Sequence, residues 1–168
     1  MDIVSHALIG KIVSVFGKKR RNSDFWAVFF AIIPDFTLIP FYLMLGYQNN
    51  RPFFIAYNQD WIGASSSFPV STAVYFLFHS FIFAFAVILP LVIFFKIPKI
   101  AFAAYLFHLI VDIPTHAGEW AIRVFYPFSN AVDGFTNAWA WPLSYMAVSW
   151  LILIVFLFLI KSIKKEGR

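Results

Sequence analysis

Four long runs of apolar residues divide the chain, and shorter polar segments separate them. The runs cover residues 25–47, 70–95, 97–113 and 143–160. Each run is near the roughly 20 residues that an α-helix needs to cross a bilayer. The third run ends at Pro114, which is compatible with a helix that stops or kinks there. The pattern therefore predicts an all-α, multi-pass integral membrane helical bundle with four long transmembrane helices.

A shorter apolar segment, Ile3–Phe16, precedes the first long run. Its length fits a half-span, an interfacial helix or a tightly fitted fifth span. We therefore expect four long transmembrane helices plus a short N-terminal helix, in a single transmembrane domain over residues 1–168. The composition agrees, because 61% of the residues are hydrophobic and only 12% are charged. The chain has no cysteine, which excludes disulfides and thiolate ligands.

The basic residues predict an orientation. If all four long runs cross, ten of the 13 basic residues fall on one side: Lys18, Lys19, Arg20, Arg21, Lys96, Lys99, Lys161, Lys164, Lys165 and Arg168. By the positive-inside rule this side is cytoplasmic, and so is the C-terminus. The basic runs are then topology signals, and no nucleic-acid partner is expected. The Trp and Tyr residues of the outer loops 48–69 and 117–142 fit interfacial belts.

Six ionisable residues lie in or beside the apolar runs: His6, Asp35, His79, His108, Asp112 and His116. Ionisable groups at membrane depth are costly, so they normally face a cavity or one another. At about 1.5 Å of rise per residue, they reach one layer between the bilayer midplane and the outer leaflet. Such a shared depth predicts a functional polar site, which could hold a metal or relay protons.

Spacing by four residues groups the ionisable residues on helical faces. His108, Asp112 and His116 form one such stripe, and Asp2, His6 and Gly10 form another, with Gly10 as a site of close helix approach. Imidazole and carboxylate ligands without thiolate suit zinc, manganese or iron. A bound metal would activate water, with Asp112 or Asp35 as the general base. Polar support is expected from Asp2, Ser80 and Thr115, and no organic cofactor is predicted.

Several short motifs, taken in order, resemble those of a known family. They are MDIVSHALIG at the N-terminus, IPDF around Asp35, FHS at 78–80, HLIVDIPTH at 108–116 followed by FYPFS, and DGFTNAWAW before the last run. This sequence is similar to the bacterial membrane-bound metal-dependent hydrolases, a group that includes LexA-regulated inner-membrane members. The resemblance covers nearly the whole chain, and its specificity lies in the order and spacing of the motifs.

The resemblance implies a metal-binding and catalytic set, namely His6, Asp35, His79, His108, Asp112 and His116. Two motifs depart from the family pattern. Phe36 and Thr37 follow Asp35 where many members have PDxDH, and VYFLF precedes His79 where many have HRGxTHS. One metal is therefore better supported than two. The HxxxD stretch followed by a further His also resembles zinc-dependent phospholipases C, which implies a phosphoester substrate.

Three functions remain open from the sequence. The first is a membrane-embedded hydrolase of a lipid or lipid-linked phosphoester or ester, with a divalent metal, zinc above all. The second is a proton or divalent-metal transporter that uses the same residues, and the third is a metal-stapled structural bundle. The stretches FWAVFFAII and KIAFAAYLF offer no polar path toward the cytoplasm, which favours the hydrolase. The expected partner is the lipid bilayer of the bacterial inner membrane, and the sequence leaves protein partners open.

Overall fold

The computed structural model describes residues 2–18 and 20–166, so Lys19 and Arg168 of the predicted basic runs lie outside the described residues. Its regular elements are helices, and the one β contact in the described part is an isolated antiparallel bridge between Ile122 and Val132. The α-helices are α1 (Ile3–Phe16), α2 (Ser23–Phe36), α3 (Ile39–Gln48), α4 (Ala64–Ser67), α5 (Pro69–Phe78), α6 (Phe81–Phe83), α7 (Leu89–Phe94), α8 (Lys99–Thr115) and α9 (Leu143–Glu166). A π-helical turn, η3 (Ala84–Ile88), joins α6 to α7, and the 3-10 turns are η1 (Pro52–Phe54), η2 (Asn58–Trp61), η4 (Gly118–Trp120) and η5 (Ala138–Ala140).

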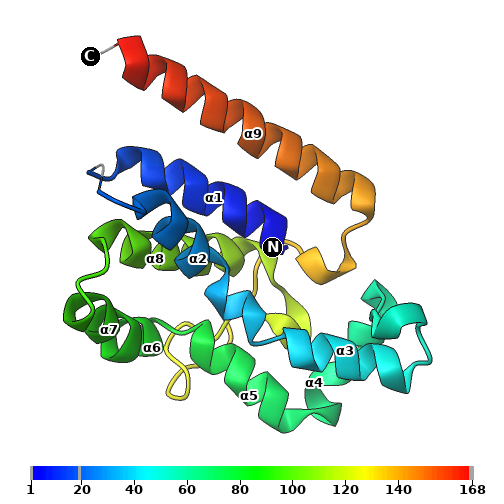
Figure 1. The fold of residues 1–168 in the computed structure, drawn as a ribbon. Coiled ribbons are helices and arrows are strands. Elements are labelled where there is room, and N and C mark those ends of the chain that lie inside the picture. The colour runs from blue at the N-terminus through cyan, green and yellow to red at the C-terminus, as the bar shows by residue number, and fades with distance from the viewer. Residues whose placement is uncertain (1, 19, 167–168) are drawn as a thin grey trace.

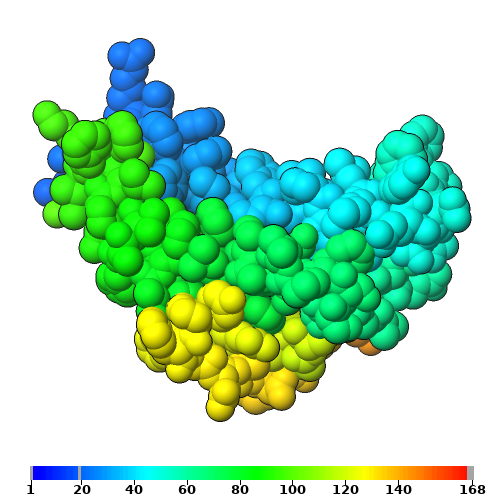
Figure 2. All heavy atoms as spheres, turned by 90° about the horizontal axis from the view of Figure 1, so that it is seen from below, coloured from blue at the N-terminus to red at the C-terminus, as the bar shows by residue number. Residues whose placement is uncertain are grey.

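Helices α1, α2 and α8 pack against one another and form the centre of the molecule (Figure 1). Helix α9 lies along the outer side of α1, while α5, α6 and α7 lie on the other side of the centre. Figure 2 views the molecule from the face opposite α9, where α3 and α5–α7 supply most of the surface. The centre is thus enclosed by protein, whereas α9 is an outer helix.

Gly10 brings α1 close to α2. A Cβ atom at this position would lie 2.8 Å from the carbonyl oxygen of Ala27 and 2.8 Å from Cβ of Ala31. Ile9, Ala27, Ala31 and Ala104 belong to one buried cluster between the three central helices. The close approach expected at Gly10 is therefore confirmed, and small residues on α2 complete it.

The prediction of four long transmembrane helices plus a short N-terminal helix is wrong, although the structure is helical. Among the described residues, two helices are long and apolar enough to cross a membrane, Ser23–Gln48 and Leu143–Lys165. A third span is counted only if Pro69–Phe78 and Phe81–Phe94, which are bent by 58°, act as one. Ile3–Phe16 is a shorter apolar helix.

Two of the expected spans are not long unbroken helices, for different physical reasons. The run 97–113 corresponds to α8, which has 17 residues and buries six of them against other helices. It is apolar because it forms protein core, which a count of apolar residues does not distinguish from a lipid-facing helix. The run 70–95 is interrupted at Ser80, whose hydroxyl caps a new helix by accepting a hydrogen bond from the Phe83 amide.

Several of the Trp residues in the loops form a packed core and do not lie in an interfacial belt. Trp61 and Trp120 are 3% and 1% exposed, and their rings meet edge to face with centroids 5.4 Å apart. Trp139 stacks on Trp61 at 4.4 Å. The interfacial interpretation is therefore wrong for Trp61 and Trp120, while Tyr57 is 46% exposed. This aromatic core holds the loops against one end of the central helices.

Candidate metal centre

Three central helices bring four of the predicted ligands together. His6 comes from α1, Asp35 from α2, and both His108 and Asp112 from α8; all four are buried. One ligand atom from each lies within 4.8 Å of the others, so the group could hold a metal ion. Because His108 and Asp112 are one helical turn apart, a single helix supplies half of the group.

The distances in this group fit a metal centre. Nε2 of His6 is 3.1 Å from Oδ1 of Asp112, and Nε2 of His108 is 3.1 Å from Oδ2 of Asp112. Two ligand atoms on one zinc ion lie roughly 3.3 Å apart, because bonds of about 2.0–2.2 Å meet at tetrahedral angles. The contacts of Asp35 are longer, at 3.8 Å to His6 and 3.9 Å to His108. Asp35 is therefore the member of the group that lies farthest from the histidines.

Backbone carbonyls orient two of the imidazoles. Nδ1 of His108 is 2.7 Å from the carbonyl oxygen of Ala31, and Nδ1 of His79 is 2.8 Å from that of Tyr75. A carbonyl oxygen only accepts, so both Nδ1 atoms carry a hydrogen and a neutral ring presents its Nε2 lone pair. This is the arrangement that fixes metal-binding histidines in proteins.

The Nε2 atoms of His79 and His108 approach each other beside the four-residue group. They lie 3.1 Å apart, and Nε2 of His79 is also 3.6 Å from Asp35 and 3.5 Å from Asp112. Lone pairs and carboxylates at such distances repel one another unless a cation lies among them. The donor set therefore fits a divalent metal, and His79 stands at the edge of the four-residue group.

The remaining predicted ligand, His116, lies beside the group. It follows the last turn of α8, where its Nδ1 is 3.0 Å from the backbone oxygen of Asp112 and 3.6 Å from Oδ1 of that residue. His116 is 1% exposed. Pro114 and the end of α8 account for this position, since the backbone of His116 is extended and no longer continues the helical stripe. His116 is thus placed to orient Asp112.

The three residues expected to support the ligands have different surroundings. Asp2 caps α1, because its carboxylate accepts hydrogen bonds from the amides of Val4 and Ser5. The Thr115 hydroxyl donates to the carbonyl of Val111 and lies 3.3 Å from Nδ1 of His116. Ser80 caps α6 and donates to the carbonyl of Tyr126, so its hydroxyl serves the backbone rather than a histidine.

Three further residues of the site were not predicted from the sequence. Ser5 is fully buried, and its hydroxyl donates to Asp2 at 2.6 Å. The ring of Tyr75 packs on His79 with centroids 4.1 Å apart. The indole N–H of Trp150 donates to Asp2 at 2.9 Å. The sequence did contain a signal for Tyr75, because it precedes His79 by four residues and so lies on the same helical face. It contained none for Trp150, which is 148 positions away from Asp2.

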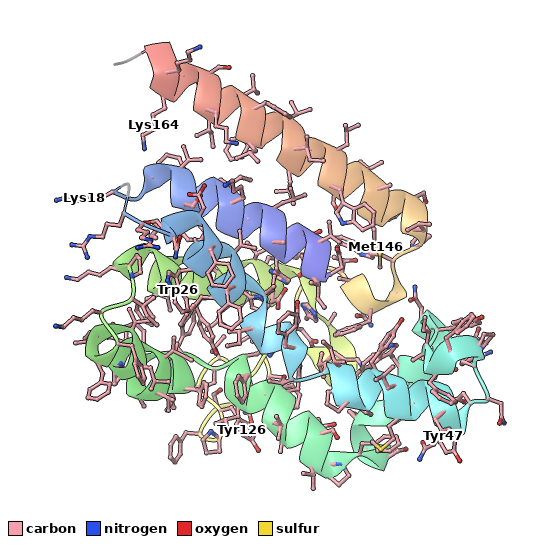
Figure 3. All side chains as sticks on the ribbon, viewed as in Figure 1. Lys18, Trp26, Tyr47, Tyr126, Met146 and Lys164 are labelled. Carbon is pink, nitrogen blue, oxygen red and sulfur yellow. The ribbon has the colours of Figure 1, made fainter. Side chains whose placement is uncertain are left out.

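A pocket of about 530 Å³ reaches the group from outside, near the start of α1. Asp35 is the only member of the four-residue group that lines it. The other lining residues are mainly apolar or aromatic: Ile3, Val4, Leu38, Ile39, Tyr42, Trp61, Ala138, Trp139, Met146 and Trp150, with Asp2 and Asn58 as polar members. Met146, on α9, lies beside the first turn of α1 (Figure 3). A ligand in this pocket would meet Asp35 through an apolar surround.

Apolar helices long enough to cross a membrane, together with a buried His/Asp group, define an integral membrane protein with a candidate metal centre. The sequence model of a family described as "YdjM inner membrane protein" matches residues 1–168, and the chain belongs to this family. The predicted membership of a bacterial inner-membrane family is confirmed. No curated protein and no solved structure matches the chain.

Proposed function

We propose that this protein is a membrane-embedded, metal-dependent hydrolase that cleaves a phosphoester or ester of a lipid or lipid-linked substrate. The observation that carries the proposal is the convergence of imidazole nitrogens and carboxylates in a group whose Asp35 lines an apolar pocket. The converging nitrogen and carboxylate atoms provide metal ligands, and the apolar pocket matches an acyl or isoprenoid chain.

His6, His108, Asp112 and Asp35 would hold the metal, with His79 available as a further ligand. A divalent metal supplies Lewis acidity, which polarises a phosphoryl or carbonyl oxygen and lowers the pKa of a coordinated water. Zinc suits this donor set, and manganese or iron would be accepted by the same atoms.

Residues of the chain would provide the general base, order the ligands and exclude water. Asp35 lines the pocket, and its Oδ2 accepts no hydrogen bond within the described residues. This atom is therefore placed to take the proton of an attacking water. Asp112 lies deeper, between His6, His108 and His116, where it orders the imidazoles. The aromatic walls of Trp61 and Trp139 would exclude bulk water from the reacting bond.

The transporter alternative needs polar groups that continue through the membrane. Beyond the His/Asp group, toward the end of α1 near Lys18, the central helices pack through the buried apolar cluster of Ile9, Val13, Ala27, Ala31 and Ala104. A site that is open at one end and closed by an apolar cluster at the other favours catalysis over passage.

The first test is the metal content of detergent-purified protein by elemental analysis. We expect about one zinc, manganese or iron per chain in the wild type, and its loss in His108→Ala and Asp35→Ala. Glu119→Gln is the matched control, because Glu119 is exposed and binds the amides of Gly63 and Ser65 away from the site. A wild type without tightly bound metal would refute the proposal.

The second test is hydrolysis. The metal-loaded protein is incubated with phospholipids and lipid-linked phosphates, and released headgroup, phosphate or fatty acid is measured. Loss of a general base lowers rates by about 10²–10⁴-fold, so Asp35→Asn should fall at least that far if it retains metal. A panel in which the wild type is no faster than Asp35→Asn would remove the catalytic role and leave only a metal site.

A further inference from the structure

A second pocket lies at the other end of α1, away from the His/Asp group. It has a volume of about 460 Å³ and is formed by α1, the start of α2 and the last turns of α9. Its lining residues are Lys11, Ser14, Val15, Gly17, Asp24, Lys161, Lys164 and Lys165. Four lysines and one aspartate give this pocket a net charge of +3.

The contacts of these lysines leave part of the charge available to a ligand. Lys11 pairs with Asp24, so these two charges cancel. Lys164 donates to the backbone oxygen of Val15, and its side chain reaches from α9 toward α1 (Figure 3). Its charge is therefore held over the pocket, and within the described residues no carboxylate forms an ion pair with it. Lys161 and Lys165 are exposed and lie one helical turn apart on α9.

The position of the pocket relates it to a membrane. The lysines of α9 stand at the end of a 23-residue segment that is long and apolar enough to span a bilayer. Immediately before them, Val155, Phe158 and Leu159 are about half exposed or more and present apolar surface. Phe16, at the end of α1, is 67% exposed and lies 5.8 Å beneath the Lys164 ammonium. Cationic groups directly beyond an apolar surface match a phosphate headgroup with its acyl chains.

We infer that this pocket, in which Lys161, Lys164 and Lys165 carry the available charge, binds the phosphate headgroup of an anionic phospholipid. The lysines neutralise the phosphate, and the apolar faces of α9 and Phe16 contact the chains. The volume suits a ligand of headgroup size, because small-molecule sites span about 300–1,000 Å³. A free phosphate would gain the charge contacts but not the apolar ones, so the lipid is the tighter ligand. This lipid is distinct from the substrate at the His/Asp group, since the apolar cluster of Ile9 and Val13 separates the two sites.

Native mass spectrometry of the full chain from detergent micelles tests the inference. The probes are phosphatidylglycerol, phosphatidylcholine and glycerol 3-phosphate, which has the phosphate without the chains. We expect phosphatidylglycerol to bind the wild type most tightly, and Lys161→Gln/Lys165→Gln to bind it roughly tenfold more weakly. The matched control is Lys96→Gln/Lys99→Gln, which removes the same charge outside the pocket and should bind as the wild type does.

Three results would overturn the inference. Equal affinity for phosphatidylcholine would remove the role of charge, and equal affinity for glycerol 3-phosphate would make the pocket a soluble-anion site. An equal loss in Lys96→Gln/Lys99→Gln would make the effect one of overall charge. Lys161→Arg/Lys165→Arg keeps the charge and should retain binding, which guards against a folding defect. Metal content should be the same in every variant, so this test and that of the proposed hydrolase fail independently.

Discussion

Helices α8 and α9 are both apolar, but they have opposite surroundings. Six residues of α8 are buried, among them His108 and Asp112. The segment of α9 that could span a membrane has no buried residue. Helix α8 packs against α1 and α2 at the centre, whereas α9 lies along α1 on the outside (Figure 1). Apolar composition therefore has two origins in this protein, protein core in α8 and exposure to lipid in α9.

Polar residues distinguish the two cases where hydropathy does not. In α8, His108 and Asp112 stand in the second half of the helix, at a spacing that puts them on one face. In α9, the lysines gather at the last turns, where they can reach water. An ionisable residue in the interior of an apolar helix thus marks the side that faces protein.

The largest effect is expected from filling the contact between α1 and α2. In Gly10→Leu the new side chain would collide with the backbone of Ala27, which forces the helices apart. Overpacking typically costs about 1–3 kcal/mol and occasionally more, and here it would also separate His6 from Asp35. We expect lower thermal stability and loss of bound metal, measured as monodisperse protein after heating and by elemental analysis.

Ala147→Leu is the control for that comparison, because Ala147 is an exposed residue of α9. Its added volume meets lipid or detergent, so stability and metal content should stay at wild-type values. Similar losses in both variants would show that α9 is as closely packed as α1, against the structure.

The next effect is a several-fold contrast in access from the bilayer. Since the chain has no cysteine, single cysteines can be spin-labelled without background. Ala103→Cys on α8 starts from a partly buried residue beside the central cluster, and Val155→Cys on α9 from one that is 49% exposed. In liposomes, electron paramagnetic resonance should find frequent collisions with dissolved oxygen at position 155 and fewer at position 103. The reverse order would contradict the assigned surroundings.

A smaller effect concerns the attachment of α9 to α1. Trp150→Phe keeps an aromatic ring, although a smaller one, and removes the indole N–H that donates to Asp2. A hydrogen bond to a charged group contributes about 1.5–3 kcal/mol at most, and a partly exposed one contributes less. We expect a melting temperature lower by a few degrees with metal content unchanged, followed by tryptophan fluorescence. Tyr145→Phe, at an exposed position of the same helix, should leave the melting temperature unaltered.

The smallest effect is expected outside the membrane segments, at the pair of Arg51 and Asp60. The guanidinium donates to both carboxylate oxygens, at 2.7 and 2.9 Å, and holds the pKa of Asp60 below its ordinary value. A depressed pKa contributes stability above the unfolded-state pKa, and this contribution is lost as pH falls through the folded-state pKa. Asp60→Asn should therefore lower the melting temperature slightly at about pH 7 and have less effect near about pH 3. A pH-independent difference would show that charge pairing is not the cause.

Much of the candidate site could be predicted from residue types alone. His6, Asp35, His108 and Asp112 are costly in an apolar chain, and the four-residue spacing in α8 fixes two of them on one face. Their proximity in the structure follows from the same cost of burial, since buried ionisable groups are stabilised by contact with one another. His116 lies just outside the group because α8 ends at Thr115. Pro114 indicated that the helix would end or kink there, but not where the backbone would place the His116 side chain.

The number of spans could not be predicted in the same way. A 17-residue apolar run such as α8 has the same hydropathy pattern whether lipid or protein surrounds it. The break at His79 and Ser80 depends on a tertiary contact, because the Phe81 amide donates to the carbonyl of Val124 far along the chain. Such long-range pairings leave no periodic trace, and the same holds for the burial of Trp61 and Trp120 under the loops.

The length of α9 has a consequence for the kind of membrane the protein suits. Met146 borders the apolar pocket and Lys164 the basic one, and the 18 residue steps from one to the other correspond to about 27 Å of helix. This is close to the roughly 30 Å hydrocarbon thickness of a typical bilayer, so the two pockets can face opposite headgroup layers at once. In a markedly thicker bilayer, hydrophobic mismatch would draw one pocket into the hydrocarbon or thin the bilayer around the helix. The acyl-chain length of the lipids sets the bilayer thickness, and through α9 it affects the position of both pockets relative to the headgroup layers.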